Sequence, residues 1–336
     1  MPSGSRRRYG AVGVLLIVLA VMTAVAALCL GSEILLPQQV WRILREGSSS
    51  SDSVSVIVWQ LRLPRMTMAA MVGVLLSVAG VILQGLLRND LADPYTIGVS
   101  SGAAMGASAA VLAGWEARWH GFGVPLAAFV CAIAATALVL MVARREGVLR
   151  VSVFLLAGIV VGSFMWSVVT LMLTLAGADV GRVLFWLMGS FADAEWTRVR
   201  LLLPFVVLGF VGLRAMAYGL NAFALGEESA AHLGFEVEKL KRWAIVLAAL
   251  CTAAAVSVSG IIGFVGLVVP HIARRLFGAD HRQLFWSAAV LGAVLMVWAD
   301  TLARSIARPA EIPVGVITAL LGAPFFIALL RRERLV

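Results

Sequence analysis

Side chains able to carry acid–base, nucleophilic or metal chemistry are few and scattered along this sequence. The three cysteines, Cys29, Cys131 and Cys251, each lie inside an apolar run, and their spacing fits neither a disulfide framework nor a metal-thiolate site. No combination of Ser, His and Asp, of His and Glu, or of Cys and His converges at one depth of these runs. The G-x-x-x-x-G-K-S/T loop that cradles ATP phosphates is also absent. The sequence therefore predicts a chain with no catalytic residue, metal or bound cofactor of its own.

Two titratable side chains inside apolar runs need an explanation. His271 follows Pro270 and invites the idea of a haem ligand, but a lone histidine in such a place is more often hydrogen-bonded structure. Asp300 lies in an apolar run, where a carboxylate can act as a proton relay in a secondary transporter. No second acid inside a run accompanies it, and Glu311 stands only at the start of the last run. Since Arg304 follows Asp300 by one helical turn, we favour a structural ion pair.

Long apolar runs set the elements that must position these side chains. Hydrophobic residues make up 61% of the 336 residues and charged residues 13%, against roughly 25% charged in an ordinary soluble domain. The runs are ~18 to 25 residues long, the length that an α-helix needs to cross a ~30 Å hydrocarbon core. The sequence thus predicts an all-α polytopic membrane protein with about ten transmembrane helices. The expected spans are 11–30, 66–86, 94–114, 124–143, 151–175, 199–216, 243–262, 264–277, 284–303 and 312–330.

Basic residues indicate how these helices are oriented. A net charge of +9 could suggest nucleic-acid binding, but the basic residues sit in pairs at helix ends instead of in one long run. With a cytoplasmic N-terminus, the inside segments hold 17 of the 27 Lys and Arg residues, as the positive-inside rule requires. We therefore expect a multi-pass protein of the inner (plasma) membrane, surrounded by lipid, with both termini cytoplasmic and no nucleic-acid partner. The stretch 11–30 is expected to be a retained helix, because it exceeds the usual apolar core of a signal peptide.

The connections are short apart from three. Segments 31–65 and 176–198 lie outside and 217–242 lies inside, and loops of this size tend to carry function. No internal repeat divides the chain, so one transmembrane domain of residues 1–336 is expected.

Two glycine series predict close packing. Glycines recur at every fourth position over 98–106, which clears one helix face for another backbone. Three glycines over 260–266, with Pro270, interrupt an apolar stretch and predict a short outside turn between the seventh and eighth helices.

The inside loop 217–242 is the only cytoplasmic connection long enough to present a polar surface to another protein. Within it, residues 225–234 are typical of a short helix between glycines, and Glu227 and Glu228 at its start suit the positive end of the helix dipole. The segment is either such a partner surface or a solvated amphipathic linker.

Nine segments stand out in order over 59–332: QLRLPR from Gln60, QGLLRNDLADPYTIGVSSGAAMGA from Gln84, FLLAG from Phe154, FWLMGSF from Phe185, LNAFALGEESAAHLGF from Leu220, SGIIGFVGLVVPHIAR from Ser259, GADHR from Gly278, ADTLAR from Ala299 and EIPVGVITALLGAPFF from Glu311. Taken together, they resemble the FecCD-type permease family. One departure is visible, because Asp90 stands where the family usually has a proline.

The resemblance implies a fold, a function and partners. It implies the type II ABC importer permease architecture, working as a homodimer with its pore at the two-fold axis. The implied partners are a periplasmic substrate-binding protein and a cytoplasmic ABC ATPase homodimer, which would hold the ATP and Mg²⁺. The implied cargo is a ferric siderophore, haem or cobalamin, and a ferric siderophore is our first choice because the family is broad.

The resemblance also implies roles for particular residues. The segment that would couple to the ATPase contains Leu225, Gly226, Glu227, Glu228, Ser229, Ala230, His232, Leu233 and Gly234. The residues that would dock the binding protein are Arg62, Arg65 and Arg304, although Arg62 and Arg65 also suit interfacial snorkelling. The residues that would border the cytoplasmic gate are Asn89, Leu91, Val151 and Ser152, although a tight turn and a helix end account for them equally well.

Overall fold

The computed structural model describes residues 3–31, 33–47, 52–115, 121–145 and 148–333. In chain order the elements are α1 (Ser3–Cys29), α2 (Pro37–Glu46), α3 (Ser53–Val56), the π-helical η1 (Ile57–Arg62), α4 (Leu63–Leu87), the 3-10 helix η2 (Pro94–Ile97), α5 (Val99–Leu112), α7 (Gly123–Ala143), β1 (Arg144–Arg145), β2 (Val148–Leu149), α8 (Val151–Leu175), η3 (Gly177–Asp179), α9 (Val180–Leu187), α10 (Trp196–Ala224), α11 (Glu227–His232), α12 (Val237–Ser259), α13 (Val265–Phe277), α14 (His281–Ile306) and α15 (Val314–Glu333).

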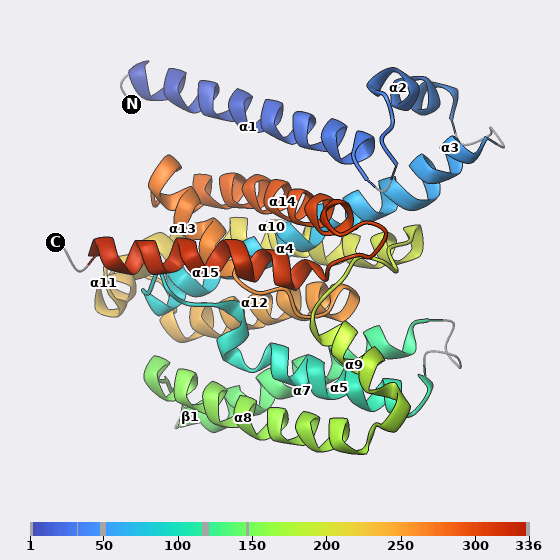
Figure 1. Cartoon of the computed structure of the whole chain (residues 1–336). Helices are drawn as coiled ribbons and strands as arrows, with labels where there is room; N and C mark the ends of the chain where they lie inside the picture. Colours follow the sequence, from blue (N-terminus) through green and yellow to red (C-terminus); the bar gives the residue numbers. More distant parts are fainter. Residues whose placement is uncertain (1–2, 32, 48–51, 116–120, 146–147, 334–336) are drawn as a thin grey trace.

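The long helices run side by side along one direction and leave two distinct ends (Figure 1). The start of α1, the end of α15, α11 and β1 lie at one end, called the α11 end below. Helices α2, α3 and α9 lie at the other, called the α2 end. The only described strands, β1 and β2, form an antiparallel ladder that pairs Arg144 with Leu149.

Each predicted span overlaps a helix, and the span 94–114 covers both η2 and α5, so the all-α architecture is confirmed and the count of about ten holds approximately. Among the described residues, six helices are long and apolar enough to cross a membrane: the continuous helix 53–87 and helices α7, α8, α10, α12 and α14. Shorter apolar stretches lie in α1, α5 and α15, and α13 has only 13 residues.

Among the helix boundaries that differ from the prediction, two shorten the inside loop. Helix α10 runs further and α12 begins earlier than expected, so the connection is 225–236 and not 217–242. The 29 residues of α10 span about 43 Å, more than the ~30 Å hydrocarbon core. The helix continues past the expected end because Leu220 and Phe223 remain buried against the bundle.

Helix α4 lies at the centre of the bundle, and most of its residues are buried. Small residues let its neighbours approach closely. A Cβ added at Gly73 would overlap the carbonyl oxygen of Gly292 in α14, and one at Gly80 would overlap that of Gly266 in α13. Such close backbone contact replaces the hydrophobic driving force that is missing between helices in lipid.

The predicted glycine face of α5 is confirmed as a packing surface. A Cβ at Gly102 would lie 2.5 Å from the carbonyl oxygen of Cys131, and one at Gly106 would overlap the carbonyl oxygen of Ala127. Both carbonyl groups belong to α7, so the two helices are in backbone contact.

The turn predicted between α12 and α13 is present over 260–264, and it packs against other parts of the chain. Gly260 and Ile262 are buried, and Gly260 packs against the backbone of Trp186 and Gly189. The Tyr95 hydroxyl donates to the carbonyl oxygen of Ile262 (2.9 Å) and accepts from its backbone N–H (3.1 Å). Non-helical backbone inside a membrane protein requires such partners, because each unsatisfied group costs several kcal/mol in hydrocarbon.

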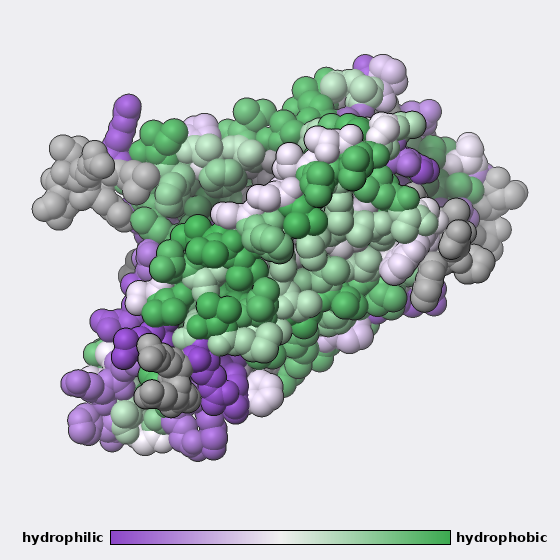
Figure 2. All heavy atoms as spheres, turned by 90° about the horizontal axis from the view of Figure 1, so that it is seen from below, coloured by the Kyte–Doolittle hydropathy of each residue, from purple (hydrophilic) through white to green (hydrophobic). Residues whose placement is uncertain are grey.

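The surface shows the pattern of a membrane protein. Figure 2 shows a broad band of hydrophobic residues along the bundle, with hydrophilic residues gathered toward its ends. Large apolar side chains such as Leu156, Ile159 and Phe164 on α8 are exposed in this single chain. They can be covered only by lipid or by another protein subunit.

Candidate coupling, gating and docking sites

The short helix expected in the inside loop is present as α11, at the α11 end (Figure 1). Glycines with positive φ flank it: Gly226 has φ 121° and Gly234 has φ 86°, conformations that favour glycine. Of the expected coupling residues, Ala230 is buried against the bundle, whereas Leu225 and Leu233 are exposed. The geometry therefore presents an anchored helix with apolar side chains at both ends, which suits insertion into a cleft.

The first expected gate segment follows α4 and is held by local and long-range bonds. Asn89 accepts a hydrogen bond from the backbone N–H of Leu91 (2.9 Å), and the Leu91 side chain is exposed. Asp90 pairs with Arg274 of α13 (3.4 Å) and lies 4.0 Å from Nδ1 of His271. The aspartate in the family's proline position thus ties the loop to α13, a contact that proline cannot make. His271 is buried beside this loop, as expected of a structural histidine.

The second expected gate segment is the start of α8, directly after the β1–β2 ladder. Val151 is half-buried and Ser152 is exposed, at the α11 end of the molecule. Within this chain, the described hydrogen bonds and ion pairs do not join this segment to Asn89 or Leu91.

The start of α14 is fixed to the end of α10 at the same end. Asn221 of α10 donates to the carboxylate of Asp280 (2.8 Å) and accepts from the backbone N–H of His281 (3.0 Å). Partial burial raises the pKa of Asp280, but hydrogen bonds from the Arg282 side chain and backbone and from Asn221 outweigh it and lower the pKa below its usual value.

The three arginines expected to dock a binding protein lie together at the α2 end, but two of them face inward. Arg62 is only 4% exposed and donates to the carbonyl oxygens of Leu28, Cys29 and Glu33. Arg304 is also buried and donates to the carbonyl oxygen of Ala27. The two guanidinium groups therefore donate to the carbonyl oxygens of Ala27 and Leu28 in the last turn of α1, where carbonyls lack intrahelical partners.

Arg65 forms the ion pairs of this cluster. Its guanidinium holds both carboxylate oxygens of Asp300 (2.8–3.1 Å) and also pairs with Glu311 (3.0 Å). Arg304 is the more distant partner of Asp300, at 3.7 Å. The expected Asp300–Arg304 pair exists, and Arg65 also links Asp300 to Glu311, which lies just before α15. Two arginines face two carboxylates, so the cluster is an ion-pair network.

An open cavity of 340 Å³ exposes the edge of this network. It is lined by Glu33, Ile57, Leu61, Arg62, Arg65, Ala192, Ala194, Arg304 and Glu311. Of the three arginines that line it, Arg62 and Arg304 are buried, and the Arg65 side chain is 13% exposed.

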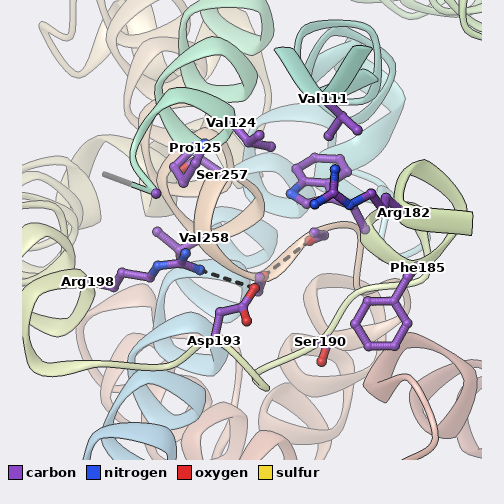
Figure 3. A pocket seen from close by; sticks show the side chains of 14 residues that line it. Val111, Val124, Pro125, Arg182, Phe185, Ser190, Asp193, Arg198, Ser257 and Val258 are labelled. Carbon is purple, nitrogen blue, oxygen red and sulfur yellow. Dashed lines mark hydrogen bonds and ion pairs between the residues drawn. The ribbon is translucent and has the colours of Figure 1, made fainter. Parts of the chain in front are cut away.

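A second cavity, of 220 Å³, lies at the α2 end between α5, α7, α9 and α12 (Figure 3). Val111, Val124 and Phe185 form apolar walls, and the Arg198–Asp193 pair (3.9 Å) spans one side. The described residues contain no group of three His, Cys, Asp or Glu that could hold a metal ion. No local sequence pattern indicated this cavity, because its lining residues come from segments far apart in the chain.

Comparison with known proteins identifies the class of the chain. The sequence profile of the FecCD transport family matches residues 16–332. The chain belongs to this family. Among relatives of the FecCD chain, the cobalamin import system permease protein BtuC of Halobacterium salinarum is 42% identical over 83% of this chain and 74% of its own length. The hemin transport system permease protein HmuU of Yersinia pestis is 36% identical over 95% of both chains.

A solved structure supports the same assignment. An inward-facing metal-chelate type ABC transporter aligns with a TM-score of 0.84 and 32% identity, over 96% of this chain and 99% of that chain. The resemblance drawn from the nine segments is therefore confirmed, and the FecCD chain is a membrane permease of the ABC importer class. The roles of individual residues in coupling, docking and gating stay predictions.

Proposed function

We propose that the chain is the translocating subunit of a binding-protein-dependent importer that carries a ferric chelate of the siderophore class into the cell. The observation that carries the proposal is the FecCD match over residues 16–332, which spans every long helix of the bundle. Because no phosphate-binding loop occurs in the sequence, hydrolysis of ATP is assigned to a separate ABC ATPase homodimer.

The two ends of the bundle contact different partners in this proposal. The α11 end is cytoplasmic in this proposal, as are both termini, and α11 fits a cleft on the ATPase. The α2 end faces the binding protein, whose acidic residues meet the cavity lined by Arg62, Arg65 and Arg304. Charge pairs of this kind give register and a fast association rate more than affinity, which suits a partner that must leave after each cycle.

In this proposal, two copies of the chain form a homodimer, and the substrate passes between them. The exposed apolar side chains of α8 need a cover, and a second copy would place two gates, each with Asn89, Leu91, Val151 and Ser152, around one two-fold axis. In the cycle, the loaded binding protein docks, ATP closes the ATPase subunits, and α11 passes that motion to the helices.

Cobalamin is the second candidate cargo, because the Halobacterium salinarum relative is named as a cobalamin permease, and haem is the third. Proton-coupled transport is disfavoured, because the Asp300 carboxylate is the counter-ion of Arg65 and Arg304.

The deciding experiment reconstitutes the permease with its ATPase and binding protein in proteoliposomes. ATP hydrolysis and uptake are followed while ferric siderophores, haemin and cobalamin are added in turn. We expect one loaded binding protein to stimulate both, and the unloaded binding protein serves as the control. Uptake driven by a proton gradient alone, without an ATPase, would overturn the proposal.

A further inference from the structure

One lysine joins the short helix α11 to the strand that leads into α8. Lys241, near the start of α12, is 2% exposed. Its ammonium contacts the carboxylates of Glu227 in α11 (2.7 Å) and Glu238 in α12 (3.0 Å), and donates to the carbonyl oxygen of Leu149 in β2 (3.3 Å). The other oxygen of Glu238 accepts from the backbone N–H of Leu149 (2.9 Å).

The neighbouring Lys239 shows what an ordinary lysine does at this place. Lys239 is largely exposed and pairs only with Glu236, in the preceding turn (2.7 Å). Such exposed ion pairs contribute little to the stability of the folded protein. Lys241 instead loses almost all contact with water, a cost that an apolar side chain of similar size would avoid. Its contacts therefore need a reason beyond local helix stability.

The position of Leu149 supplies that reason. Only Arg150 separates Leu149 from α8, whose first residues, Val151 and Ser152, are expected to border the gate. Leu149 is held twice, at its carbonyl by Lys241 and at its N–H by Glu238. The Lys241 ammonium therefore links α11 to Leu149, just before the start of α8.

We propose that Lys241 is the positioning residue that transmits a displacement of α11 to the start of α8. The proposal rests on the proposed function, in which α11 is moved by an ATPase. Glu227 is 48% exposed and stands at the start of α11, where a partner would press. Charge-assisted hydrogen bonds are short and strong, so a shift of Glu227 displaces the ammonium and, with it, Leu149.

The test compares Lys241→Met with Lys239→Met in the full complex in proteoliposomes. Both changes remove one positive charge from the first turns of α12, but only the first removes a link to β2. We expect Lys241→Met to keep the ATPase bound and to hydrolyse ATP, while substrate moved per ATP falls about fivefold or more. Lys239→Met should match the parent protein.

A spectroscopic readout separates transmission from general destabilisation. Spin labels at Ala231→Cys in α11 and Val153→Cys in α8, both exposed positions outside the expected coupling and gate residues, report each helix separately in a background without the native cysteines. With Lys241 present, both labels should move on ATP binding. With Lys241→Met, the α11 label should still move and the α8 label should not.

The outcomes distinguish the two proposals. If the parent complex shows no ATP-driven uptake, the proposed function fails and this inference fails with it. If the parent complex works and Lys241→Met matches Lys239→Met, only the inference is overturned. If Lys241→Met does not assemble, Glu238→Gln decides in the same assays: impaired transport per ATP supports the link, and parental values overturn it.

Discussion

Replacing Asp300 with Asn tests whether the ion-pair network at the α2 end stabilises the fold. The Asp300 carboxylate is 3% exposed and is held by Arg65 at 2.8–3.1 Å and by Arg304 at 3.7 Å. Asn keeps the size but removes the charge, so both guanidinium groups lose a buried counter-ion. Breaking a buried pair costs about 3–5 kcal/mol. Because Arg65 retains Glu311, we expect the free energy of unfolding to fall by about 3 kcal/mol, the lower edge of that range.

Glu311→Gln is the matched control. Glu311 contacts the same guanidinium but is 40% exposed, so its loss should cost about 1 kcal/mol or less. Equilibrium unfolding in mixed micelles, followed by the fluorescence of the ten tryptophans, measures both changes. Equal losses in the two variants would refute the reasoning, because they would show that burial of Asp300 has no energetic consequence. The double variant Arg65→Met/Asp300→Leu should be destabilised by less than the sum of its single changes.

Three further predictions concern packing, the buried turn and pH. Gly102→Ala should push α5 away from α7, because the added Cβ would lie 2.5 Å from a carbonyl oxygen, and the apparent melting temperature in detergent should fall. The control Gly13→Ala should leave the melting temperature unchanged, because an added Cβ there has no atom within 4 Å. Tyr95→Phe should cost about 1–3 kcal/mol, measured by equilibrium unfolding, because the backbone N–H and carbonyl of Ile262 lose their shared partner. The pKa of Asp280 is lowered in the folded protein, so its contribution to stability is present above its unfolded pKa of about 4. This contribution is lost as the pH falls through the lower folded pKa. Asp280→Asn should therefore reduce the dependence of the melting temperature on pH in the acid range.

The long helices were predictable because their apolar runs have the length that a bilayer demands. Their ends were missed, and so were the short helices α2, α3 and α9, which lie in segments that were expected to be loops. The true end of α10 depends on Leu220 and Phe223 packing against the bundle, which a hydropathy pattern cannot show. The buried turn at 260–264 was predicted as a turn, but its depth depends on Tyr95, a residue far away in the sequence.

The candidate sites were predictable where local sequence decides the geometry. α11 was found because two glycines with positive φ flank it. Long-range pairs were missed, since Arg65 and Asp300 lie 235 positions apart and no local spacing connects them. The sequence did hold one signal, because charged side chains inside apolar runs, such as Asp300, require partners. Lys241 gave no such signal, because it stands in a segment that was expected to be a loop.

The caps at the end of α1 have a consequence for how the chain is made. The carbonyl oxygens of α1 are satisfied by Arg62, which follows soon after it, and by Arg304, which is synthesised 277 positions after Ala27. At about 5–20 residues per second, a ribosome needs roughly 14–55 s to cover that interval. Throughout this time the first helix rests in the bilayer without its final neighbour α14. A nascent chain interrupted before α14 would therefore expose an incompletely seated helix, which membrane quality-control proteases can recognise.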